Sequence, residues 1–386
     1  MKELHIIEIK YTGREKKHRM KRFGTISYNI YANFTNYGSA LQTWALHQAI
    51  KKTGNTPVLV DYCPNILADK DPLNPFKNMW DQSDEAKKMV ELTIQAIRIN
   101  YKKFNIFYHE RFERTFQKYT SENFNNITRE GIERFVCGSD TIFCPDEFGI
   151  DDGYYANYDV MRGNSVSYAA SFGDPHFTDE TYHLLNQRIL NFKALGIREN
   201  LMVPYLKEHT SVPVQRVIDP TLLLTEKEYD PIIAKTQVEE KYLLLYSRRY
   251  SENMENYAKK LAKEKGLRII EISLRAVNAE LGHIMRYDAG VEEFLSLIKN
   301  AEYVVTNSFH GMIFSVQFRR PFVIFSREQC DNKIIELLSL FGLSDRMLVN
   351  GTESFRETID YNMVHSNIEV ARTDSIKFLN MELELI

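Results

Sequence analysis

The fold of the second half of the chain is decided by the stretch Tyr303-Val304-Val305-Thr306-Asn307-Ser308-Phe309-His310-Gly311. An apolar strand pattern ends at Thr306, and Asn307 and Ser308 are residue types that cap helix N-termini. Apolar residues then recur three and four positions apart, as on one face of a helix. A strand, a short turn and a helix in this order are typical of one unit of a parallel α/β sheet.

The same alternation continues on both sides of this stretch. In the second half, strand patterns separated by single helical patterns lie at Tyr242–Tyr246, Leu267–Ile272 and Phe322–Phe325. In the first half they lie at Arg22–Tyr28, Val58–Tyr62, Arg134–Cys137, Ser165–Ala170, Ala194–Arg198 and Val214–Ile218. The sequence therefore predicts an α/β protein with two Rossmann-like domains, residues 22–228 and 229–365, facing across a cleft.

Three segments fall outside this repeat. Residues 1–21 form a basic N-terminal extension, since residues 1–22 hold eight Lys/Arg against three Asp/Glu, and a solvated tail is expected. Residues 84–119 form a helical insertion on the acceptor side of the first domain, with an apolar stripe expected to pack on that domain. Residues 366–386 form a C-terminal helix expected to pack back onto the first domain.

Composition excludes several classes of protein. The net charge of -3 favours no nucleic-acid partner, and no apolar run is long enough to span a membrane. The four cysteines are scattered without a CxxC pair, which indicates neither a disulfide framework nor a zinc site and favours a cytoplasmic protein. No HExxH, GxGxxG, GxxxxGKS/T or GxSxG motif is present, so no metal, nicotinamide, flavin or Walker loop is expected.

The turn at residues 306–311 is the strongest candidate site. Ligands of open α/β sheets bind beyond the carboxyl ends of the strands. There the free N–H groups that follow Asn307 and Ser308 favour a phosphate or carboxylate. His310 stands in the same first turn, where it is suited to transfer a proton near neutral pH. The spacing fits a histidine packed at a helix start equally well.

Other strand ends carry further candidates. An arginine fork matches a carboxylate or phosphate, which favours Arg198 and Arg248 as anion ligands, although a surface ion pair is the usual role of a lone arginine. Asp140 suits a sugar hydroxyl or a base, and it fits a turn cap as well. The residues assigned to substrate binding are Asn36, Gly38, Ser139, Asp140 and Ser171.

Six short motifs in order resemble the polysaccharide pyruvyl transferase family over about residues 22–345. They are Asn36–Gln42, Gly138–Asp140, Ser167–Gly173, Arg198-Glu199, Asp219–Leu223 and Thr306–Gly311. The resemblance implies a glycosyltransferase B-like fold and transfer of a pyruvyl group from phosphoenolpyruvate to sugar hydroxyls, often as a cyclic ketal. It also implies catalytic roles for His310 and Arg198, with no cofactor besides the donor substrate. The chain departs from the family pattern at Thr141–Cys144, which affects the acceptor more than the donor.

Two alternatives stay open at this point. One is a nucleotide-sugar-dependent glycosyltransferase of the same fold, and the other is a sugar-binding protein without turnover. The expected acceptor is a polysaccharide or its precursor, lipid-linked or free. The basic, aromatic segment 84–119 suits docking at the inner face of a membrane. No oligomeric state is favoured by the sequence.

Overall fold

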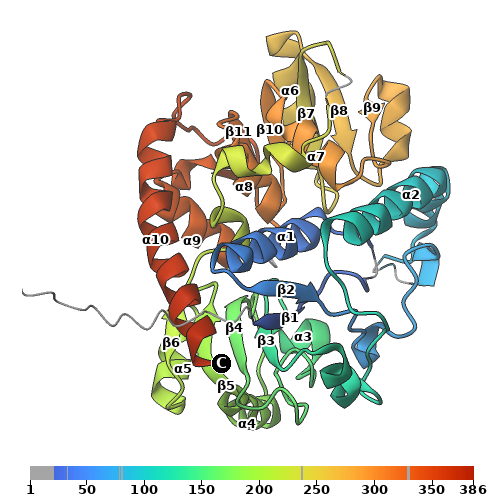
Figure 1. The fold of residues 1–386 in the computed structure, drawn as a ribbon. Helices are drawn as coiled ribbons and strands as arrows, with labels where there is room; N and C mark the ends of the chain where they lie inside the picture. Colours follow the sequence, from blue (N-terminus) through green and yellow to red (C-terminus); the bar gives the residue numbers. More distant parts are fainter. Residues whose placement is uncertain (1–20, 33, 78, 80, 236–237, 328–330) are drawn as a thin grey trace, which may run out of the picture.

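The computed structural model describes residues 21–386 except 33, 78, 80, 236–237 and 328–330. The predicted N-terminal extension therefore lies outside the described residues, apart from Lys21. Two parallel six-stranded sheets, each with its own helices, form the two halves of the molecule (Figure 1). The predicted α/β fold class is confirmed.

The first sheet has the strand order β2-β1-β3-β4-β5-β6, and all of its neighbours are parallel. The strands are β1 (Arg22–Ile26), β2 (Thr56–Leu59), β3 (Arg134–Cys137), β4 (Ser165–Ala170), β5 (Phe192–Ile197) and β6 (Val214–Arg216). The helices of this half are α1 (Tyr37–Lys52), α2 (Asp84–Arg111), α3 (Pro145–Phe148), α4 (Asp179–Arg188) and α5 (Val203–His209).

The second sheet has the order β12-β11-β10-β7-β8-β9, again with parallel neighbours. Its strands are β7 (Tyr242–Tyr246), β8 (Arg268–Ile272), β9 (Ile284–Met285), β10 (Tyr303–Thr306), β11 (Phe322–Phe325) and β12 (Met347–Leu348). The helices that follow them are α6 (Glu252–Lys265), α7 (Val291–Lys299), α8 (Phe309–Gln317), α9 (Asp331–Phe341) and α10 (Tyr361–Leu385).

Helix α8 joins the two halves. All nine of its residues are buried, from Phe309 to Gln317. A helix that is buried all round must be covered on every side. Here its own sheet covers one side, while α1 and the short 3-10 helix Pro220–Leu222 of the first half cover another. The strand ends of both sheets therefore meet near the start of α8.

Helix α2 contacts more of the molecule than the sequence predicted. One helix begins after its cap Ser83 and ends before Phe112, and the residues beyond it run alongside β2. Its apolar stripe was expected to pack on the first domain, and Phe104, Phe107 and Tyr108 belong to a core cluster with residues of α1. Helix α2 also packs on α7 and on the 3-10 helix Ala276–Leu281 of the second half, where Lys103 Nζ lies 2.6 Å from Glu293 Oε2.

Helix α10 begins beside α9 and ends against β4 and β5 of the first sheet (Figure 1). Its Arg372 Nε donates to the carbonyl of Leu222 at 2.7 Å. Ser375 Oγ accepts a hydrogen bond from the Ile218 N–H at 3.0 Å. The C-terminal helix thus starts earlier than the predicted residue 366 and contacts both halves. No helix among the described residues is long and apolar enough to cross a membrane.

Candidate active site

Two helix N-termini, one from each half, meet at His310. Ser308 caps α8 by accepting a hydrogen bond from the Gly311 N–H at 3.2 Å. Asn36 caps α1 by accepting from the Gly38 N–H at 3.0 Å. Gly38 is so close to the imidazole that a methyl group on it would stand 1.9 Å from His310 Nδ1. The N-termini of both helices therefore lie close together, and a helix N-terminus favours an anion.

His310 and Arg198, the two predicted catalytic residues, converge on one carboxylate that the sequence assignment had missed. Asp219 Oδ2 lies 3.5 Å from His310 Nε2 and 3.1 Å from Arg198 Nη1. The other oxygen of Asp219 accepts from Thr221 N–H at 2.9 Å and from its hydroxyl at 2.6 Å. All three members of this cluster are buried. The signal that could have found Asp219 is its place before Pro220, directly after a strand pattern.

The charges of the cluster stabilise one another. Burial favours the neutral carboxyl of Asp219, but His310 and Arg198 outweigh it and hold the pKa of Asp219 well below its usual range. Burial likewise opposes the charge of Arg198, while Glu199 and Asp219 raise its pKa overall. The pKa of Asp140 is lowered by Arg198 and His310 against the effect of burial. These shifts favour the ionised forms of Asp219, Asp140 and Arg198 at neutral pH.

The cluster keeps hydrogen-bond donors for a ligand. Among the described residues, Arg198 Nη2 has no hydrogen-bond partner although it is buried. His310 Nε2 has only the 3.5 Å contact with Asp219 Oδ2. Arg198 and Asp219 line a cavity of about 150 Å³ between the halves, together with Phe309 and Lys333. The Phe309 ring centre lies 5.1 Å from Arg198 Cζ and 5.6 Å from Lys333 Nζ. Two cations therefore flank this ring.

Two of the residues predicted to bind substrate use their hydroxyls in hydrogen bonds within the protein. Ser139 is fully buried, and its hydroxyl donates a hydrogen bond to the carbonyl of Ala169 at 2.8 Å. Ser171 is fully buried as well, and its hydroxyl donates to Glu199. Both hydroxyls hold neighbouring strand ends together, and a substrate contact of either residue stays a prediction. Asp140 accepts from Ser39 Oγ at the start of α1, so its carboxylate stays next to the cleft.

Arg248 and Asn307 lie at the edge of the site. Asn307 uses both ends of its amide on the chain after β7: its Oδ1 accepts from the Arg248 N–H at 2.8 Å, and its Nδ2 donates to the Arg249 carbonyl at 2.7 Å. It therefore holds a loop, and both ends of its amide are used within the protein. Arg248 is exposed, and its Nη1 lies 3.4 Å from the Thr35 carbonyl of the first half. Its guanidinium remains accessible between the halves.

Comparison with known families shows the class of this protein. The family model for polysaccharide pyruvyl transferases matches residues 36–329, a span that contains every residue of the cluster. The chain belongs to the polysaccharide pyruvyl transferase family. It is accordingly a transferase, and pyruvyl transfer to a polysaccharide is the class of reaction that membership supports.

Solved structures resemble this pyruvyl transferase family member in fold. A putative UDP-N-acetylglucosamine 2-epimerase from Listeria monocytogenes superposes with a TM-score of 0.50 at 9% identity, covering 94% of this chain and 91% of that one. The S. aureus MnaA-UDP co-structure gives a TM-score of 0.47 at 12% identity, covering 95% and 90%. No curated protein matches the chain in sequence. In the described part of the chain, no group of three or more His, Cys, Asp or Glu is arranged to hold a metal ion.

The depressed pKa of Asp219 predicts a pH-dependent contribution to the stability of this family member. The contribution is fully present above the unfolded pKa of about 4 and is lost as the pH falls through the lower folded value. We expect Asp219→Asn to lower the free energy of unfolding by about 1.5–3 kcal/mol at neutral pH, with the difference shrinking below pH ~4. Urea unfolding across this range measures it.

The matched control is Asp159→Asn, since Asp159 forms an exposed ion pair with Arg162. That variant is expected to change stability by less than about 1 kcal/mol. A stability difference for Asp219→Asn that does not vary with pH would contradict the lowered pKa of Asp219.

Proposed function

We propose that this protein transfers the pyruvyl group of phosphoenolpyruvate to sugar hydroxyls of a polysaccharide or its precursor in the cytoplasm. The product is a pyruvate ketal, and phosphate is released. The observation that carries the proposal is the buried Arg198 Nη2, which has no hydrogen-bond partner among the described residues, in a site whose motifs belong to the pyruvyl transferase family. Buried donors without a partner are costly unless a ligand satisfies them.

Phosphoenolpyruvate fits the charge of this site because it carries a carboxylate and a phosphate. Arg198 offers the edge of its guanidinium that Asp219 leaves free. Lys333, which sequence reasoning did not select, adds a second cation beside Phe309. Arg248 supplies a third at the cleft edge, and the capped start of α8 adds backbone N–H groups near Ser308.

Ketal formation requires proton transfers, which we assign to His310. A proton adds to the methylene carbon of the donor, and one sugar hydroxyl oxygen bonds to the carbon that bears the phosphate. A second hydroxyl oxygen then bonds to the same carbon, and the bond to the phosphate oxygen breaks. One hydroxyl proton ends on the new methyl group and the other on phosphate. His310 transfers these protons, while Asp219, 3.5 Å from its Nε2, orients the imidazole.

Ligand-dependent stability and phosphate release test this proposal against both alternatives. Phosphoenolpyruvate is expected to stabilise the protein by about 2.7 kcal/mol at a hundred times its Kd, measured by thermal unfolding. Phosphate release is expected only when phosphoenolpyruvate and a sugar acceptor are both present. Stabilisation by uridine or guanosine diphosphate sugars alone would favour the glycosyltransferase instead. Stabilisation without phosphate release on any acceptor of a broad panel would favour the binding protein.

A further inference from the structure

The outward face of α2 carries a line of exposed aliphatic side chains. Leu92, Ile99 and Ile106 are 55%, 47% and 44% exposed. They stand seven residues apart, close to two helical turns, so they lie along one side of the helix over about 21 Å. Leu73, from the loop before α2, is also exposed. Single exposed aliphatic residues are ordinary, but an aligned set indicates a contact surface.

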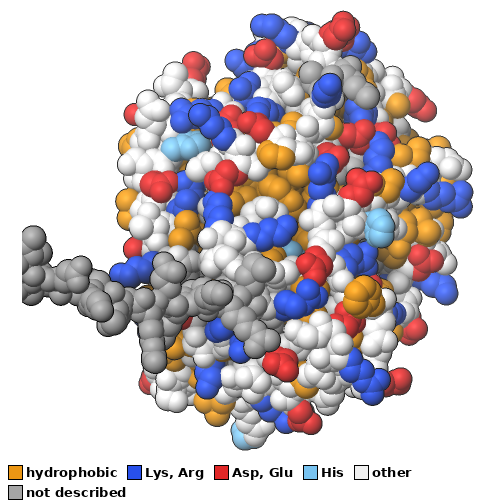
Figure 2. Space-filling view, in the orientation of Figure 1, with side chains coloured by type: hydrophobic (Ala, Val, Ile, Leu, Met, Phe, Trp, Pro, Cys, Tyr) orange, Lys and Arg blue, Asp and Glu red, His pale blue; other side chains and the backbone are white. Residues whose placement is uncertain are grey.

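The charged side chains on the two faces of α2 differ in whether they form ion pairs. On the face toward the second half, Lys103 pairs with Glu293 and Arg111 with Glu292. On the outward face, Lys88, Arg98 and Lys102 form no ion pair with any described residue. In the space-filling view, apolar and basic side chains alternate over α2 at the right of the molecule (Figure 2). The outward cations are therefore available to an anionic partner.

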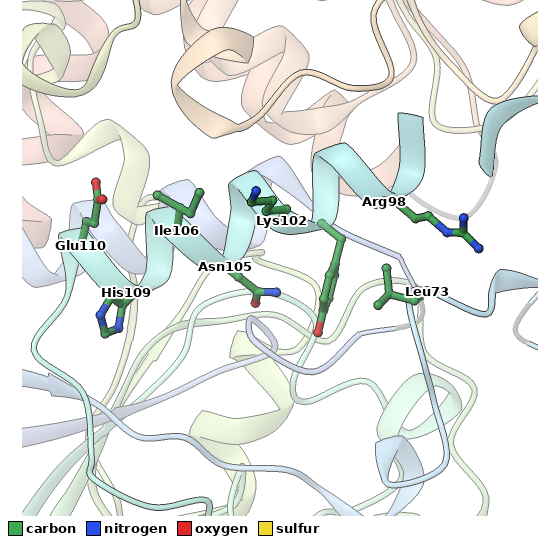
Figure 3. A pocket seen from close by; sticks show the side chains of 8 residues that line it. Leu73, Arg98, Lys102, Asn105, Ile106, His109 and Glu110 are labelled. Atoms are coloured by element: carbon green, nitrogen blue, oxygen red, sulfur yellow. The ribbon is translucent and has the colours of Figure 1, made fainter. Parts of the chain in front are cut away.

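A hollow lies on this face, between α2 and the loop that precedes it. It encloses about 590 Å³ and is lined by Leu73, Arg98, Tyr101, Lys102, Asn105, Ile106, His109 and Glu110. Figure 3 shows Leu73 on the loop side of the hollow, with the helix residues lining the other side. Aliphatic side chains, a tyrosine and long cationic side chains are the mixture found where proteins meet the headgroup layer of a bilayer. One carboxylate, Glu110, stands at the end of the hollow.

The opposite side of α2 reaches the candidate active site. Asn100 Nδ2 donates to the Tyr37 hydroxyl at 3.2 Å and its Oδ1 accepts from Thr35. Tyr37 is the first residue of α1, and Gly38 after it contacts His310. Only the thickness of one helix, about 10 Å, separates the outward face of α2 from this end of the cleft.

We propose that the outward face of α2, with Leu73, docks on an anionic membrane surface. The aliphatic line enters the boundary between headgroups and acyl chains, and Arg98 and Lys102 contact lipid phosphates. Docking there holds the cleft close to an acceptor carried on a lipid. The proposal concerns where the enzyme works, so it stands or fails independently of the donor that the site uses.

Flotation of the full chain with lipid vesicles tests this surface. We expect the protein to float with vesicles of phosphatidylcholine and phosphatidylglycerol, to float much less with phosphatidylcholine alone, and to dissociate as salt rises. Ile99→Gln/Lys102→Gln is expected to reduce partitioning onto the anionic vesicles on the order of tenfold. Phosphate release with a water-soluble acceptor is expected to be unchanged in this variant.

The matched control removes one aliphatic and one basic residue from α10, Val370→Gln/Lys377→Gln, where Val370 is 67% exposed. This control should float like the wild type, and thermal unfolding shows that both variants are folded. Equal flotation of the α2 variant and the wild type, or equal flotation on neutral and anionic vesicles, would overturn the proposal. A dimer seen by sedimentation and abolished by the α2 variant would overturn it in favour of a second copy of the chain.

Discussion

His310→Gln is expected to lower kcat by about 10²–10⁴-fold, the usual contribution of a general acid or base, and to leave the protein folded. Glutamine keeps a polar group against Gly38 and Asp219 but cannot transfer a proton as imidazole does. The measurement is phosphate release from phosphoenolpyruvate with a sugar acceptor, at saturating and limiting donor. Because the lost interaction belongs to the transition state, the decrease should appear in kcat with little change in KM.

A second histidine provides the control for this variant. His365 lies on α10 and its Nε2 contacts the Val316 carbonyl at 3.1 Å, away from the cluster. His365→Gln is expected to keep wild-type turnover. A folded His310→Gln protein with unchanged kcat, or one in which only KM rises, would remove His310 from proton transfer and leave it a binding role.

The sheets could be predicted because parallel strands are buried on both faces and read as apolar runs. Val304 and Val305 of β10 are fully buried, as their pattern indicates. The edge strands β9 and β12 have two residues each, too few to carry a pattern. The order of strands within a sheet depends on contacts between segments far apart in the chain, which spacing does not encode.

The strand-end rule found residues of the site but could not rank them. It selected Arg198 and His310, which converge, and also Ser139 and Ser171, whose hydroxyls are used within the protein. Local sequence shows that a polar side chain follows a strand, whereas its partner is decided by a neighbouring strand end. Lys333 gave no local signal at all, since its place beside Phe309 arises only when α8 and α9 pack together.

Helix α2 illustrates the same limit on a larger scale. Its stripe of apolar residues correctly predicted a buried face. Such a stripe does not indicate which part of the protein packs against it. Phe104 contacts the ring of Tyr37, and Tyr37 in turn stacks on Phe294 of the second half. The helix therefore bridges both halves, although the sequence places it in the first.

Gly38→Ala is expected to lower kcat on the order of 10²-fold, although position 38 lies in a helix and alanine is ordinarily the better helix former there. The new methyl group would stand 1.9 Å from His310 Nδ1 and 2.5 Å from two ring carbons. The imidazole must turn away to make room, which carries its Nε2 away from Asp219 Oδ2, now 3.5 Å distant. A displacement of about 1 Å is enough for such a loss.

A double-mutant cycle separates this effect from a general disturbance of α1. If Gly38→Ala acts by moving His310, adding it to His310→Gln should cause no further loss of kcat, because the group it displaces is already gone. Urea unfolding of all three variants is expected to show the added methyl group changing stability less than turnover. Additive losses of kcat in the double variant would instead mean that α1 contributes to catalysis by a route other than the imidazole, through the N–H groups capped by Asn36 or through Asp140.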